Sequence, residues 1–126
     1  RFIAAGLLSG YVWMTVAGVL LIAFGGVPAG LIYDAQLHAV FIGFVFSMIF
    51  AHAPIILPAL SGLAVPYHGR FYVHLALLHV SLAVRIAGDL LALPDVRRWG
   101  GLLNAAAILL FLFNTAWAVR RGRRTA

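Results

Sequence analysis

The sequence predicts an all-α polytopic membrane protein, a bundle of four transmembrane helices that run up and down. Three observations predict this class. Of the 126 residues, 64% are hydrophobic and only 10% are charged, whereas soluble domains average about 25% charged residues. The mean hydropathy is +1.06. The apolar residues gather in four runs, each close to the roughly 20 residues that a helix needs to cross the hydrocarbon core.

The four runs form a single domain over residues 1–126. They cover about residues 2–25, 35–60, 71–93 and 99–119. The breaks between them contain glycine, proline and aspartate, which end helices for backbone reasons. Connections this short make consecutive helices antiparallel neighbours. In the first run, Gly6-x-x-x-Gly10 suits close contact with another helix, although glycine is also common in membrane helices without such a role.

The arginines predict the orientation. One side of the membrane receives Arg1, Arg70 and the four arginines of the tail that follows the last run (Arg120, Arg121, Arg123 and Arg124), while the other receives only Arg97 and Arg98. The positive-inside rule then places both termini in the cytoplasm, in a bacterial-type inner (plasma) membrane. The net charge of +6 is concentrated beside a span, which is typical of contact with lipid head groups and not of nucleic-acid binding.

The composition leaves little for catalysis. The chain has no cysteine, which excludes disulfides, Fe–S clusters and thiolate ligation of haem. It also has only three acidic residues. No constellation of a nucleophile, a base and an acid can be found among the remaining residues. The sequence therefore favours a non-catalytic electron-transfer or accessory subunit over a stand-alone enzyme.

Four histidines lie inside the predicted spans: His38, His52, His74 and His79. An ionisable ring in lipid is costly unless something binds it, and neutral histidine is the commonest metal ligand. His38 and His52 are 14 residues apart, about 40° short of four full turns, so they should share one helix face roughly 21 Å apart. For any one of these histidines, a hydrogen-bonded packing role is an equally open interpretation.

Depth in the membrane selects one pair. If the connection between the second and third spans is centred near residue 65, residue 52 lies opposite about residue 78. His52 and His79 are then the expected metal ligands, with a haem held between the two helices. His74 would lie closer to the cytoplasmic surface, and it cannot face the same partner as His79, because five residues turn by about 140°.

The histidine near the opposite surface, His38, should have Arg85, Asp89 and Asn104 as neighbours. Arg85 and Asp89 are four residues apart and can pair on one helix face. Arg85 could also bind a haem propionate. Asn104 and Asn114 are expected to bridge helices by hydrogen bonds.

A family resemblance adds to this interpretation. The stretch from His38 to Ile49, HAVFIGFVFSMI, resembles the H-A-x-x-x-G-F-x-x-x-M-I pattern of NnrS-type haem membrane proteins, and it is similar to the haem-bearing helix of relatives of heme–copper oxidase subunit I. Tyr67-His68-Gly69-Arg70 resembles the loop that follows in NnrS-type proteins, and Val84 to Gly88 resembles their next helix. The resemblance spans about residues 36–119. It implies haem b binding, with His38 as the matching histidine and His68 as a second.

The resulting hypothesis is an integral membrane haem b subunit that transfers electrons within a larger respiratory-type complex. Its partners would be the lipid bilayer, other membrane subunits or further copies of the chain, and quinone. A second hypothesis is a cofactor-free accessory subunit of a respiratory or photosynthetic complex. It predicts histidine rings bonded to backbone carbonyls or to Asn and Ser. A proton or ion conduit through Arg85, Asp89 and His38 is a third.

Overall fold

The computed structural model of the protein describes residues 1–62 and 65–125, with side chains up to residue 122. This part of the chain is all helical and contains no strand. Its four apolar helical segments, each long enough to cross a membrane, are Phe2–Phe24, Leu31–Ser61, Phe71–Leu90 and Pro94–Gly122. The predicted fold class is confirmed.

The helices are α1 (Phe2–Phe24), α2 (Leu31–His38), η1 (Ala39–Val45), α3 (Phe46–Ser61), α4 (Phe71–Leu90) and α5 (Pro94–Thr125). The elements α2, η1 and α3 follow one another without a break and form the second span. Two spans begin earlier than predicted. Pro94 is the first residue of α5, because proline is well tolerated in the first turn of a helix, where its missing N–H has no partner to lose. The second span begins at Leu31, so that Asp34 lies inside it.

The central part of the second span, η1, is a π-helix. A π turn contains about one more residue than an α turn. The side chains that follow it are therefore rotated around the helix axis by roughly 100°, the angle of one residue, relative to a continuous α-helix. The prediction that His38 and His52 share one face assumed 100° for every residue. It does not hold across η1.

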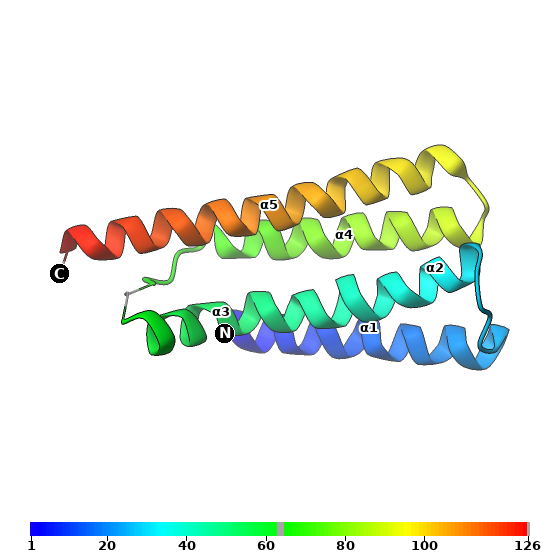
Figure 1. Ribbon diagram of the computed structural model, residues 1–126, viewed down its shortest axis with the longest axis horizontal. Coiled ribbons are helices and arrows are strands. Elements are labelled where there is room, and N and C mark those ends of the chain that lie inside the picture. Colours follow the sequence, from blue (N-terminus) through cyan, green and yellow to red (C-terminus); the bar gives the residue numbers. More distant parts are fainter. Residues whose placement is uncertain (63–64, 126) are drawn as a thin grey trace.

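The spans are arranged as two hairpins (Figure 1). One hairpin pairs α1 with the second span, and the other pairs α4 with α5. The hairpins meet where α1, α2 and η1 contact α4. Toward the end that carries both chain termini, α3 diverges from α4 and α5 (Figure 1).

Glycines set the closest helix contacts. A Cβ added at Gly6 would lie 2.7 Å from the Cβ of Ala51, and one added at Gly10 would lie 2.7 Å from the Met48 side chain. Of the two interpretations of Gly6-x-x-x-Gly10, the structure shows the close helix contact, and it lies within the chain, between α1 and α3. Gly88 and Gly100 play the same part between α4 and α5, where an added Cβ would lie 2.6 Å from backbone atoms of the other helix.

The register between α3 and α4 differs from the prediction. The ring of Phe50 packs edge-on against that of His74, with the centroids 5.0 Å apart, and Gly43 lies beside Leu82. His52 is therefore level with about residue 73, not 78. The error arises at the connection, because α3 continues for about two turns past the level at which α4 begins.

Candidate functional site: the histidines and the polar groups within the spans

Two histidines of the second span have the same local geometry. The Nδ1 atom of His38 lies 2.7 Å from the carbonyl oxygen of Asp34, and that of His52 lies 2.8 Å from the carbonyl oxygen of Met48. A carbonyl only accepts, so each Nδ1 carries the proton and donates it, leaving the lone pair on Nε2. Both residues are partly exposed. Neither Nε2 atom has a hydrogen bond in the described part of the chain, and neither is buried.

On α4, His74 is enclosed. It is only 1% exposed and is surrounded by the rings of Phe2, Phe50, Phe71 and Phe111, with centroids between 5.0 and 6.2 Å away. The Asn114 side-chain amide donates to its Nδ1 over 3.2 Å. Its Nε2 atom then carries the proton and is buried without a hydrogen-bond partner. His74 fills the core and offers no lone pair to a ligand.

His79 is engaged in a similar way. The indole N–H of Trp13 on α1 donates to its Nδ1 over 2.9 Å. Its Nε2 therefore carries the proton, and this atom is also buried without a partner. A metal at Nε2 would require a proton on Nδ1, directly opposite the Trp13 N–H.

The predicted ligand pair of His52 and His79 does not fit this arrangement. The two residues differ in depth, since Phe50 is level with His74, and the Nδ1 of His79 is occupied by Trp13. Among the described residues, no group of three or more His, Cys, Asp or Glu side chains could hold a metal ion. The donor atoms that fit an axial haem ligand are the Nε2 atoms of His38 and His52, because metal-bound histidines almost always donate their other N–H to a fixed acceptor.

The loop histidine, His68, lies outside the spans. Its Nδ1 accepts the backbone N–H of Arg70 over 3.3 Å, and its ring lies edge-on to Trp117 at 5.5 Å. This geometry belongs to the connection before α4, not to the haem site that the resemblance implies.

An ion-pair cluster joins the two hairpins at the end opposite the termini. Asp89 is buried and pairs with the predicted Arg85 at 3.3 Å and also with Arg97. Asp34 from the other hairpin pairs with Arg97 at 2.7 Å and with Arg85 at 3.4 Å. Two carboxylates thus balance two guanidinium groups, and this neutrality lowers the cost of holding charge near lipid.

Only half of this cluster follows from the sequence. The four-residue spacing of Arg85 and Asp89 predicts their pairing, which is confirmed. Asp34 precedes the predicted start of its span, and Arg97 is predicted to lie at the membrane surface. Gly88 and Gly100 are the signal that was missed, because glycines on facing helices let α5 come close enough for Arg97 to reach Asp89.

The asparagines of α5 bridge to α4, as predicted. The side-chain oxygen of Asn104 accepts the Ser81 hydroxyl over 2.6 Å, and Asn114 bonds to His74 and to the Arg70 carbonyl. The expectation that Asn104 would lie beside His38 is wrong, since it lies at the level of Ser81, about two turns deeper than Asp89.

An apolar groove opens where the hairpins diverge. Its volume is about 490 Å³, and its walls come from α3 and α5: Ile49, Ala53, Ile56, Leu57, Phe111, Leu112, Thr115 and Ala116. His52 lies on α3 between Ile49 and Ile56, three and four residues away, the spacing of neighbours on one side of a helix. His52 is therefore next to two residues that line the groove, Ile49 and Ile56, but is not itself part of the lining.

Comparison with known proteins identifies the family of the chain. No curated protein and no solved structure matches the chain. Residues 1–120, nearly the whole chain, match the family described as "Domain of unknown function (DUF8744)", and the protein belongs to that family.

Proposed function

We propose that the protein is a non-catalytic accessory subunit that packs against another subunit of a larger membrane assembly. A helix of this partner lies in the groove between α3 and α5 and donates a hydrogen bond to His52. The assembly lies in a bacterial-type inner membrane, with both termini of this chain in the cytoplasm.

One observation carries the proposal: His52 has an unbonded Nε2 lone pair and lies about one helical turn from Ile49 and Ile56, which line an apolar groove. Such a lone pair in hydrocarbon lacks the hydrogen bond that water would give it, which costs free energy. An acyl chain could fill the groove but has no donor to offer. A partner helix with a Ser, Thr, Asn or Tyr side chain supplies both apolar contact and a donor, as polar residues do between membrane helices.

The internal histidines support the same proposal. His74 is bonded to Asn114 and His79 to Trp13, while His38 and His52 donate to backbone carbonyls. These are largely the bonds that the accessory hypothesis predicts, with the indole of Trp13 in place of Asn or Ser. Each ring is thereby oriented without a cofactor.

Photo-crosslinking in native membranes tests the proposal. A photoreactive residue at Ile56, in the groove, should give a discrete adduct with one membrane protein. The same residue at Ile22, which is 88% exposed on α1 and remote from the groove, is the matched control. Adducts of equal yield from both positions, or an adduct that is a second copy of this chain, would overturn the proposal.

A second candidate function, haem binding, rests on the unbonded Nε2 atoms of His52 and His38. His52 or His38 could each provide one axial ligand to haem b bound where this chain meets its partner, and the partner would supply the other ligand. Haem b bound in this way supplies one-electron transfer. The two histidines keep their rings oriented through the carbonyls of Met48 and Asp34.

A reduced-minus-oxidised absorption spectrum of the isolated assembly separates the two candidates. The accessory function predicts no haem signal that depends on this chain. A haem α-band that His52→Ala or His38→Ala removes, while His68→Ala leaves it, would establish the haem function and displace the first candidate.

A further inference from the structure

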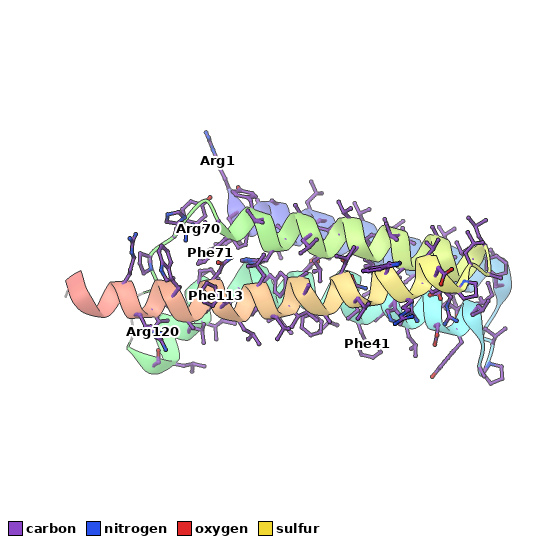
Figure 2. All side chains as sticks on the ribbon, turned by 90° about the horizontal axis from the view of Figure 1, so that it is seen from above. Arg1, Phe41, Arg70, Phe71, Phe113 and Arg120 are labelled. Carbon is purple, nitrogen blue, oxygen red and sulfur yellow. The ribbon has the colours of Figure 1, made fainter. Side chains whose placement is uncertain are left out.

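Charge is divided unequally between the two ends of the molecule. All three acidic residues of the chain, Asp34, Asp89 and Asp95, belong to the end opposite the termini, and the sequence contains no glutamate. At the other end, the charged side chains of the sequence are all arginines. Figure 2 shows Arg1, Arg70 and Arg120 together at that end. The sequence places no acidic side chain at this end.

Two of these arginines are held in place by one indole ring. The guanidinium carbon of Arg70 lies 4.8 Å from the centre of the Trp117 ring, and that of Arg121 lies 4.3 Å from it. Cation–π contacts of this kind are favourable at distances up to about 6 Å. Arg70 precedes α4 and Arg121 lies on α5, so Trp117 brings together two charges that are 51 positions apart in the sequence.

The backbone around Arg70 is fixed as well. Its N–H donates to the Nδ1 of His68, and its carbonyl oxygen accepts the side-chain amide of Asn114 on α5 over 3.4 Å. The Arg70 backbone is therefore bonded on one side within the connection and on the other to α5, and less conformational entropy remains to be lost when an anion binds.

A hollow lies beside this cluster. Its volume is about 240 Å³, and it is lined by Pro66, Tyr67, His68, Trp117, Ala118 and Arg121. The walls combine a guanidinium, a phenol and an imidazole with apolar groups. Trp117 is near the end of the last span, where tryptophan marks the boundary between hydrocarbon and water.

We propose that Arg70, Arg121 and Trp117 form a binding site for the phosphate of an anionic glycerophospholipid, independently of the partner proposed above. Guanidinium groups bind phosphate through paired hydrogen bonds. His68 and Tyr67 offer further polar contacts to the head group, and the acyl chains continue along the apolar surface of the spans. The position at the membrane boundary favours a lipid phosphate over a free anion.

Lipid binding measured by native mass spectrometry tests the site. The full chain in a neutral detergent is titrated with phosphatidylglycerol and, separately, with phosphatidylcholine. We expect the Arg70→Gln/Arg121→Gln double variant to bind phosphatidylglycerol roughly 30-fold more weakly, the equivalent of about 1 kcal/mol per arginine. Its binding of phosphatidylcholine should stay the same.

Two further variants separate a built site from diffuse attraction. Arg98→Gln removes one charge from the exposed surface at the opposite end and should leave binding unchanged. Trp117→Leu keeps every charge but removes the ring that both guanidinium groups contact, and it should weaken binding several-fold. Circular dichroism establishes that each variant keeps its helices.

Three results would overturn the proposal. In the first, Arg70→Gln or Arg121→Gln alone weakens binding no more than Arg98→Gln does. In the second, Trp117→Leu binds phosphatidylglycerol as the unchanged protein does, which would mean attraction by net charge only. In the third, inorganic phosphate at the lipid's concentration displaces phosphatidylglycerol, which would identify a site for a free anion.

Discussion

At the scale of single residues, the polar side chains inside the spans are bonded mainly to one another. Trp13 bonds to His79, Ser81 to Asn104, and Asn114 to His74. Each bond links two helices, and in lipid neither partner could turn to water instead. These bonds fix which helix faces meet, and among the four histidines of the spans they leave His38 and His52 with a ring nitrogen open to the outside.

The Trp13–His79 bond gives the first residue-scale prediction. Trp13→Phe keeps an aromatic ring next to Gly43 but removes the indole donor, so the buried Nδ1 of His79 loses its partner. We expect a loss of about 1 kcal/mol or more in the free energy of unfolding, measured as a lower midpoint of thermal unfolding in detergent. Trp99→Phe, at an exposed position, is the control. Equal midpoints for the two variants would contradict the account.

The ion-pair cluster gives the second. Asp89 is buried and pairs with both Arg85 and Arg97. Asp89→Asn removes the charge that balances them, and breaking a buried pair in this way typically costs about 3–5 kcal/mol. Its partners are partly exposed, so the lower end of that range is expected. Asp95→Asn makes the same replacement of a carboxylate by an amide at an exposed residue, and it should leave the free energy of unfolding unchanged. A similar effect of both substitutions would mean that the charge of Asp89 does not stabilise the cluster.

At the scale of helices, hydropathy predicted the four spans, but their packing depended on features that hydropathy does not carry. The π-helix η1 rotates His52 relative to His38, and no residue pattern in Ala39–Val45 signals it. The register of α3 against α4 depends on how far α3 continues beyond the start of α4. The predicted pairing counts equal numbers of residues on both sides of the connection, which assumes that α3 ends at the level where α4 begins. It therefore selects His79, whereas the structure places His74 nearest to the level of His52.

The contact between η1 and α1 leads to an element-scale prediction. A Cβ at Gly43 would lie 2.5 Å from the side chain of Trp13, so Gly43→Ala forces the helices apart at the point where the hairpins meet. Overpacking of this kind costs about 1–3 kcal/mol, which should appear as a lower unfolding midpoint. Gly18→Ala, where nothing lies within 4 Å of the added atom, is the control and should be neutral or slightly stabilising. If both variants keep the original midpoint, η1 does not pack against α1 as described.

At the scale of the whole molecule, one end is closed by ion pairs and the other is open, basic and aromatic. The sequence predicted this polarity from its arginines, because charge beside a span can be counted without knowing the packing. The groove between α3 and α5 could not be predicted, because it results from the divergence of the two hairpins. The sequence of each helix indicates a membrane span but not the angle between spans.

Orientation in the membrane is the prediction that belongs to this scale. The chain has no cysteine, so a single introduced cysteine reports its own side. In intact cells we expect Asp95→Cys to react with a membrane-impermeant thiol reagent, and Gly69→Cys to react only after the membrane is permeabilised, because the positive-inside rule predicts a cytoplasmic arginine-rich end. The reverse pattern would place the termini outside.

The dependence of partner contact on the His52 imidazole is the most direct test of the proposed function. With a photoreactive residue at Ile56, the yield of the partner adduct is compared between His52→Ala and His68→Ala. The account predicts that His52→Ala removes most of the adduct while His68→Ala leaves it unchanged. An adduct that forms equally well without the His52 ring would contradict the claim that this ring completes its hydrogen bonding with a partner helix.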